Sequence, residues 1–189
     1  NVVMVDISQA AVDKGLATVS SSLDRLIKKE KITADDKAAA LAGITVATDY
    51  TALAGAQLVI EAATENEELK IKILQQLDAM LPKETLIASN TSSISITKLS
   101  AATPRESKFI CMHFFNPVPM MTWVEIIRGL QTSDATHAAV KTLAETLGKT
   151  PITVKNAPGF VVNRILVPMI NEAFFGLAEG LATPEDIDA

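Results

Sequence analysis

The stretch "LVIEAATENEELKIKILQQLDAMLPKETLIAS", residues 58–89, contains two short apolar runs on either side of a longer amphipathic segment. The runs Leu58–Ile60 and Leu86–Ala88 are typical of strands buried on both faces of a parallel sheet. Between them, Asn66–Met80 has apolar residues on one face and charges on the other, which predicts a helix. A strand, a helix and a strand in this order predict two parallel strands joined by a right-handed crossover.

The same alternation extends to both sides of this unit. Apolar residues recur at steps of three and four from Val12 to Leu26, which predicts a helix with Ser8 as its N-cap. Another helix is predicted over Asp134–Leu147. Further strands are predicted at Val2–Val5, Phe109–Met112, Val124–Ile127 and Ile152–Val154. The fold class is therefore α/β with a doubly wound sheet, and ligands are expected at the carboxyl ends of the strands.

A change of pattern at "NAPGF", residues 156–160, predicts a domain boundary. Residues 1–156 carry the alternating strands and helices, whereas residues 157–189 are predicted to be helical. The apolar segment from Phe160 to about Leu177 predicts one long helix.

Two features of this last region concern its helices. Pro168 lies inside the long helix and is expected to kink it. The ending "TPEDIDA", residues 183–189, predicts a new helix with Thr183 as N-cap and Pro184 at the first position. Because that helix has only begun, and because no G-x-G-x-x-G turn occurs in the sequence, we expect the chain to be truncated at both ends.

Composition excludes several classes of protein. The 189 residues are 48% hydrophobic with a net charge of −5, which argues against a general binder of nucleic acid. A single cysteine, Cys111, rules out an internal disulfide framework and fits a reducing compartment such as the cytoplasm. One cysteine and two separated histidines do not make a metal-ligand set. The apolar runs fall short of the ~20 residues that cross a bilayer, so no membrane span is expected.

Asp6 directly follows the first predicted strand. In a doubly wound sheet, an acid at the end of the second strand accepts hydrogen bonds from the adenine ribose and repels a 2′-phosphate, which favours NAD over NADP. A simple turn acid is the alternative interpretation.

The ends of the next two strands are also polar. Glu61 and Glu65 flank two alanines where backbone could approach a flat cofactor, although acids in the first turn of a helix need no ligand. The segment "SNTSS", residues 89–93, could bind a polar substrate, although helix capping explains at least one of its side chains.

His113 follows a predicted strand and precedes Pro117 and Pro119, which are expected to keep the next segment extended and stiff. A lone histidine is often structural. However, Glu125 lies within the next apolar strand, where a carboxylate is costly to bury without a partner. We therefore predict a His113–Glu125 pair for acid/base chemistry, toward which Asn163 could project an amide.

Three motifs occur in order along the chain: "SNTSS", "HFFNPVP" with its downstream Glu125, and "PGFVVNRI", residues 158–165. Together with Asp6 they closely resemble the NAD-dependent L-3-hydroxyacyl-CoA dehydrogenases, in particular the bacterial members that act on 3-hydroxybutyryl-CoA. The resemblance covers the whole chain. It implies a Rossmann-like NAD-binding domain over residues 1–156, without its first strand and glycine loop. Residues 157–189 would then begin an all-helical C-terminal dimerisation domain.

The resemblance also implies an activity, the oxidation of a (3S)-3-hydroxyacyl-CoA to the 3-ketoacyl-CoA with hydride transfer to NAD. His113 would be the general base, Glu125 would orient it, and Ser92 and Asn163 would hold the oxygen at C3. The residues implied for the cofactor are Asp6, Glu65, Lys70 and Ser92, and those implied for the acyl-CoA substrate are Ser22, Lys29, Asn116 and Asn163.

Ser22 and Lys29 lie seven residues apart, so both share one face of the first predicted helix and can line the path of an anionic molecule. For the neighbouring Lys28 and Lys31, the alternative interpretation is that they simply form a solvated basic face of the helix and bind no ligand. A homodimer formed through the C-terminal domain is expected, and the truncated chain alone is expected to bind NAD weakly and to turn over poorly. A crystallin-like scaffold protein and a dehydrogenase of a 3-hydroxy acid without CoA are the alternative functions.

Overall fold

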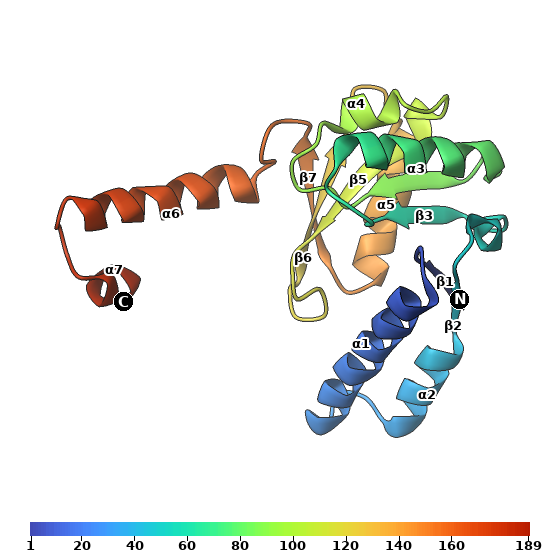
Figure 1. The fold of residues 1–189 in the computed structure, drawn as a ribbon, viewed down its shortest axis with the longest axis horizontal. Coiled ribbons are helices and arrows are strands. Elements are labelled where there is room, and N and C mark those ends of the chain that lie inside the picture. The colour runs from blue at the N-terminus through green and yellow to red at the C-terminus, as the bar shows by residue number, and fades with distance from the viewer.

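The computed structural model describes all residues 1–189 and has an α/β architecture (Figure 1). Its strands are β1 (Val2–Val5), β2 (Ile44–Ala47), β3 (Leu58–Glu61), β4 (Leu86–Ser89), β5 (Phe109–Phe114), β6 (Trp123–Arg128) and β7 (Thr150–Lys155). Its α-helices are α1 (Gln9–Lys28), α2 (Ala34–Ala42), α3 (Glu67–Met80), α4 (Ile96–Ser100), α5 (Asp134–Thr146), α6 (Val162–Ala178) and α7 (Pro184–Asp188). Every strand and helix predicted above is present.

The strands form two sheets. β1 pairs in parallel with β2, and the larger sheet has the order β3-β4-β5-β6-β7. All neighbours in the larger sheet are parallel except β5 and β6, which are antiparallel. The segment 115–122 that joins them is too short for a crossover, which needs about a dozen residues. This pair is therefore the one antiparallel pair in a mainly parallel sheet, and the doubly wound α/β class predicted from the sequence is confirmed.

Helices cover both faces of the larger sheet, with α3 and α4 on one side and α5 on the other (Figure 1). Successive side chains of β5 point alternately to the two faces of the sheet and show this arrangement. Phe109 and Cys111 pack in the core cluster with α3 and α4, whereas Ile110 and Met112 pack in the cluster with α5. All four residues are fully buried, which explains why β5 reads as a continuous apolar run.

Cys111 is the single thiol of the chain and lies at the centre of this sheet. Its Sγ lies 3.6 Å from the carbonyl oxygen of Thr91. Burial, and secondly the nearby Glu125 carboxylate, raise the pKa of the thiol well above its ordinary value. The thiol therefore stays protonated.

Helices α6 and α7 extend away from the sheet (Figure 1). α6 remains helical through Pro168, and no residue of α6 is buried. Its exposed apolar side chains include Ile165, Val167, Met169, Phe174 and Phe175. α7 begins as predicted, with Thr183 accepting a hydrogen bond from the backbone N–H of Asp186. No helix of the chain is both long enough and apolar enough to span a membrane.

Arg105 ties α3 to the strand that follows it. Its guanidinium forms an ion pair with Asp78 and donates to four carbonyl oxygens, those of Asp78, Leu81, Pro82 and Thr85. The side chain is 7% exposed, so these bonds are shielded from water. The bonds to Asp78 and Leu81 satisfy carbonyl groups at the C-terminal end of α3 that the helix itself leaves without partners, and those to Pro82 and Thr85 fix the segment that leads to β4.

Replacing Arg105 by Lys is expected to lower the free energy of unfolding by about 2 kcal/mol, because an ammonium keeps the charge but loses the planar fork of donors. Urea denaturation measures the loss. The matched control is Arg25→Lys, at an exposed position without an ion pair, where we expect a change below about 0.5 kcal/mol. Equal effects at the two positions would contradict the role given to Arg105.

Candidate active site

His113 and Glu125 face each other directly across the antiparallel strands β5 and β6. The Nδ1 atom of His113 lies 2.8 Å from Oε2 of Glu125. The predicted contact between the two side chains is therefore confirmed. Glu125 is fully buried and His113 is 7% exposed, so the pair lies largely out of water. His113 Nε2 makes no hydrogen bond within the chain, which leaves this atom free for proton exchange.

The second oxygen of Glu125 binds the start of α6. Oε1 accepts hydrogen bonds from the backbone N–H groups of Val161 and Val162, at 2.9 and 3.0 Å. Both N–H groups belong to the helix start, where donors otherwise lack partners and a negative charge is favoured. Glu125 thus connects the imidazole of the α/β domain to the first turn of the helical region.

The turn before α6 gives this connection its geometry. Gly159 and Phe160 both have positive φ angles, of 75° and 50°. A Cβ on Gly159 would lie 3.1 Å from the backbone nitrogen of Arg164, so only glycine fits there. Phe160 is a bulky residue in an unfavourable backbone region. Its buried ring meets the His113 ring edge-on, with centroids 5.6 Å apart.

A second polar cluster lies after β3 and β4. Oε1 of Glu65 accepts hydrogen bonds from the Thr91 hydroxyl at 2.7 Å, the Ser92 backbone N–H at 2.7 Å and the Ser92 hydroxyl at 3.0 Å. Burial pushes the pKa of Glu65 upward, but these hydrogen bonds together with Lys70 outweigh it and hold the pKa below its ordinary value. Glu65 therefore stays ionised and orients Ser92.

Lys70 lies beneath this cluster and is 1% exposed. Its Nζ donates to Oε2 of Glu61 at 2.5 Å and lies 3.9 Å from Oε2 of Glu65. Ser89 donates to the same Glu61 oxygen at 2.9 Å. Glu61 is thus the buried counter-ion of Lys70, a role that neither interpretation of the sequence around it predicts. In this structure Lys70 supports the loop that carries Glu65.

Replacing Glu65 by Gln is expected to lower the free energy of unfolding at pH 7 by less than about 1 kcal/mol, because its side chain is 44% exposed. The folded-state pKa lies below the ordinary ~4.3, so this stabilisation is present above that pH and is lost as the pH falls through the folded-state value. Urea denaturation between pH 7 and pH 3 should show the two proteins converging in acid. Glu68→Gln, at an exposed position, should show no such trend.

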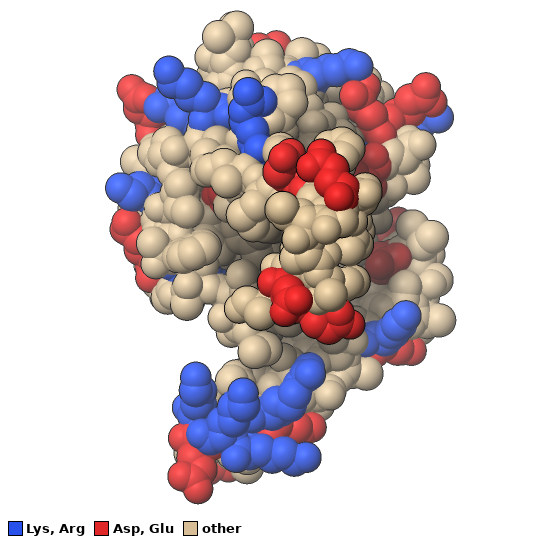
Figure 2. Space-filling model, turned by 90° about the vertical axis from the view of Figure 1, so that its left-hand side faces the viewer, with Lys and Arg blue, Asp and Glu red and all other residues tan.

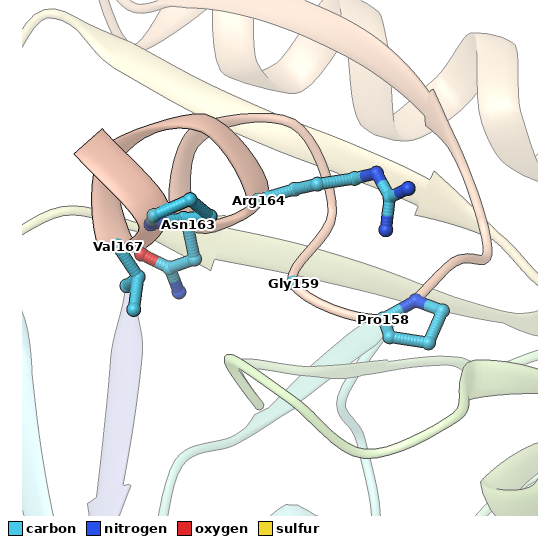
Figure 3. A pocket seen from close by; sticks show the side chains of 6 residues that line it. Pro158, Gly159, Asn163, Arg164 and Val167 are labelled. Atoms are coloured by element: carbon cyan, nitrogen blue, oxygen red, sulfur yellow. The ribbon is translucent and has the colours of Figure 1, made fainter. Parts of the chain in front are cut away.

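Asn163 lies in the first turn of α6 and lines a pocket of about 470 Å³ (Figure 3). The other lining residues are Pro158, Gly159, Arg164, Val167 and Pro168. Figure 3 shows the Asn163 amide and Val167 on one side of the helix, with Arg164 extending past Gly159 toward Pro158. The amide makes no hydrogen bond within the chain and is half-buried. It is available to an oxygen of a bound molecule.

Asp6 ends β1 and lines a separate pocket of about 320 Å³. The pocket is also lined by Val5, Ile7, Thr48, Asp49, Tyr50 and Gln76. Asp6 is exposed, and one oxygen accepts the N–H of Ile7 at 2.7 Å, which is also how a turn acid behaves. Two carboxylates at this pocket, Asp6 and Asp49, can accept hydrogen bonds from hydroxyl groups and disfavour a phosphate, so they fit the adenosine end of NAD.

The residues expected to contact CoA lie elsewhere. Ser22 is half-buried and Lys29 is exposed at the C-terminal end of α1. Figure 2 shows lysine and arginine side chains gathered at the lower end of the molecule, where α1 and α2 lie in Figure 1. Asn116 is exposed beyond β5.

The segment after His113 differs from its prediction. The backbone N–H groups of Met120 and Met121 both bond the carbonyl oxygen of Pro117, at 2.9 and 3.1 Å, and the Asn116–Pro117 peptide is cis. The expectation of an extended path was wrong, because the two strands are antiparallel and the chain must reverse between them. The turn brings the Phe115 ring within 4.8 Å of the His113 ring, a contact that the sequence did not predict.

Comparison with protein families accounts for nearly the whole chain. Residues 1–157 match the model of the 3-hydroxyacyl-CoA dehydrogenase NAD binding domain, and residues 159–189 match that of the 3-hydroxyacyl-CoA dehydrogenase C-terminal domain. The chain is also 48% identical over 189 residues to a 3-hydroxybutyryl-CoA dehydrogenase of Bradyrhizobium diazoefficiens, covering 100% of this chain and 64% of that protein. It is 41% identical to the mitochondrial hydroxyacyl-coenzyme A dehydrogenase of Rattus norvegicus, covering 99% of this chain and 62% of that protein.

Solved structures agree with these matches. The crystal structure of (S)-3-hydroxybutyryl-CoA dehydrogenase from Ralstonia eutropha has 69% sequence identity and a TM-score of 0.96, over 98% of this chain and 66% of that one. A structure from M. tuberculosis has 38% identity and a TM-score of 0.94, over 97% and 65%. The chain thus spans about two thirds of the length of these proteins.

Proposed function

The chain belongs to the 3-hydroxyacyl-CoA dehydrogenase family, and we propose that the whole protein oxidises a (3S)-3-hydroxyacyl-CoA to the 3-ketoacyl-CoA with NAD. The observation that carries the proposal is the 2.8 Å contact between His113 and Glu125 within a domain that matches an NAD-binding domain. The names of the relatives from Bradyrhizobium and Ralstonia support a short substrate, 3-hydroxybutyryl-CoA.

His113 acts as the general base in this proposal. With the Nδ1 proton donated to Glu125, the lone pair of Nε2 can accept the proton of the C3 hydroxyl. Glu125 stabilises the imidazolium that results. When bound, NAD supplies the hydride acceptor at C4 of its nicotinamide. As the hydroxyl proton goes to Nε2 and the hydride leaves C3, the C3–O bond becomes a carbonyl.

Ser92 and Asn163 hold the oxygen at C3 in this scheme. The Ser92 hydroxyl donates a hydrogen bond to Oε1 of Glu65, with the two oxygens 3.0 Å apart, so a bound substrate or cofactor would compete with Glu65 for this hydroxyl. Asn163 has a free amide beside the helix start that Glu125 fixes. Asp6, Glu65 and Lys70 would hold NAD, with the buried Lys70 acting through its bond to Glu61.

The remaining assignments concern coenzyme A, assembly and compartment. Ser22, Lys29 and Asn116 would contact the CoA moiety, and the basic surface at the end of α1 supports this placement (Figure 2). The exposed apolar side chains of α6 support a homodimer formed through the helical domain. The domain boundary would lie at residues 156–157, between β7 and α6. The protein would act in the cytoplasm.

A rate assay of the whole protein with acetoacetyl-CoA and NADH tests the function in the reverse direction. Turnover that depends on the CoA moiety is expected, so acetoacetate should be a far poorer substrate. Equal rates with acetoacetate would favour a dehydrogenase of free 3-hydroxy acids, and no turnover at all would favour a scaffold protein.

A further inference from the structure

The loop between β5 and β6, residues 115–122, has little packing of its own to hold it in place. Its residues from Asn116 to Met120 are exposed, and the side chain of Met120 is 70% exposed. The internal bonds from Met120 and Met121 to Pro117 shape the turn but do not attach it to the rest of the protein. An exposed turn with few apolar contacts opens easily unless something anchors it.

Lys149 supplies such an anchor from the connection between α5 and β7. Its ammonium donates to the carbonyl oxygens of Val118 and Met121, the latter at 2.6 Å. The adjacent Thr150 N–H bonds the carbonyl oxygen of Thr122 at 2.7 Å. Lys149 is half-buried and has no carboxylate within ion-pair distance, so its charge serves these two carbonyls. Charge-assisted bonds of this kind are about twice as strong as neutral ones.

The anchored loop borders the active site. It begins with Phe115, whose ring lies 4.8 Å from that of His113, and continues with Asn116, the proposed CoA contact. A shift of the loop would therefore move one wall of the imidazole site together with a substrate contact. We propose that Lys149 is a positioning residue, which holds the 115–122 loop against His113 and thereby sets the affinity for acyl-CoA. This inference rests on the proposed function.

Replacing Lys149 by Met keeps an unbranched side chain that is one atom shorter and removes the charge and the donors. We expect kcat/KM for acetoacetyl-CoA to fall about tenfold, mainly through KM, because small displacements of positioning groups are costly. The KM for NADH should stay unchanged, since the residues proposed to bind NAD lie outside the 115–122 loop, after β1 and in and around α3 and the segment that follows β4. Lys149→Arg should restore most of the loss, because a guanidinium can also donate to two carbonyls.

The matched control is Lys141→Met. Lys141 is exposed on α5 and its one ion pair, to Glu145, is 4.0 Å long. Hydrogen exchange of residues 115–122, measured by mass spectrometry, gives a second readout that needs no activity. Exchange in this segment should accelerate in Lys149→Met and stay at the wild-type rate in Lys149→Arg and Lys141→Met.

Three outcomes would overturn the inference. These are unchanged exchange in Lys149→Met, a KM for acetoacetyl-CoA within about twofold of the Lys141→Met control, or equal increases in KM for both substrates, which would indicate general destabilisation. An inactive wild-type protein would instead defeat the proposed dehydrogenase function. The exchange comparison would then still decide whether Lys149 anchors the loop.

Discussion

Replacing His113 by Gln is expected to lower kcat by about 10²–10⁴, because the variant loses the group that accepts the C3 hydroxyl proton. Glutamine can still donate a hydrogen bond to Glu125 and fills a similar volume beside Phe115 and Phe160. We therefore expect the free energy of unfolding to change by only about 1 kcal/mol. Steady-state kinetics with acetoacetyl-CoA and NADH, together with urea denaturation, measure the two effects.

The chain offers a matched control in its other histidine. His137 lies on α5, where its Nε2 is 2.9 Å from the Thr153 hydroxyl and its pKa is lowered by burial and by the positive charges of Arg128 and Lys141. His137→Gln should keep wild-type kcat. If His113→Gln retained a substantial fraction of wild-type activity, the general base would have to be another group.

Replacing Glu125 should damage both activity and stability, and two substitutions separate the effects. Glu125→Ala removes a buried carboxylate that accepts three hydrogen bonds, which is expected to lower the free energy of unfolding by about 3–5 kcal/mol. Glu125→Gln keeps an oxygen for the N–H groups of Val161 and Val162 and should be less damaging to the fold. Urea denaturation should therefore show a larger loss of stability in Glu125→Ala than in Glu125→Gln.

The kinetic consequence of Glu125→Gln follows from its amide nitrogen. The NH₂ group would point at His113 Nδ1 and would favour the tautomer with the proton on Nε2, which cannot accept a proton from substrate. We expect kcat to fall by about 10²–10⁴ even in the folded variant. Glu145→Gln on the surface of α5 is the control. Near-normal kcat in Glu125→Gln would show that the carboxylate does not set the tautomer.

Much of the fold could be predicted because buried strands leave continuous apolar runs in the sequence. β2 and α2 were not predicted, since the polar Thr45 interrupts the apolar run of Ile44–Ala47 and the apolar residues of α2 are nearly all alanine, which gives a weak helical pattern. The antiparallel pairing of β5 with β6 was not predicted either. Its one indication in the sequence is that the segment 115–122 between the two apolar runs is short.

The site divides in the same way. The contact of His113 with Glu125 could be predicted, because a carboxylate in an apolar strand needs a partner and the neighbouring strand supplied one. The contacts of Lys149 with Val118 and Met121 could not, because the acceptors are backbone carbonyls, which every residue carries. The positive φ angle of Phe160 could not be predicted from the sequence either, because glycine is the residue that usually occupies such a position.

The buried thiol of Cys111 has a practical consequence. The thiolate is the form that attacks alkylating reagents, and here the sulfur is both inaccessible and protonated. A reagent can reach it only after α3 and α4 have moved off this face of the sheet or β5 has separated from its neighbours. The rate at which an alkylating reagent labels Cys111 in the native protein therefore reports how often the core around β5 opens. No engineered cysteine is needed for this measurement.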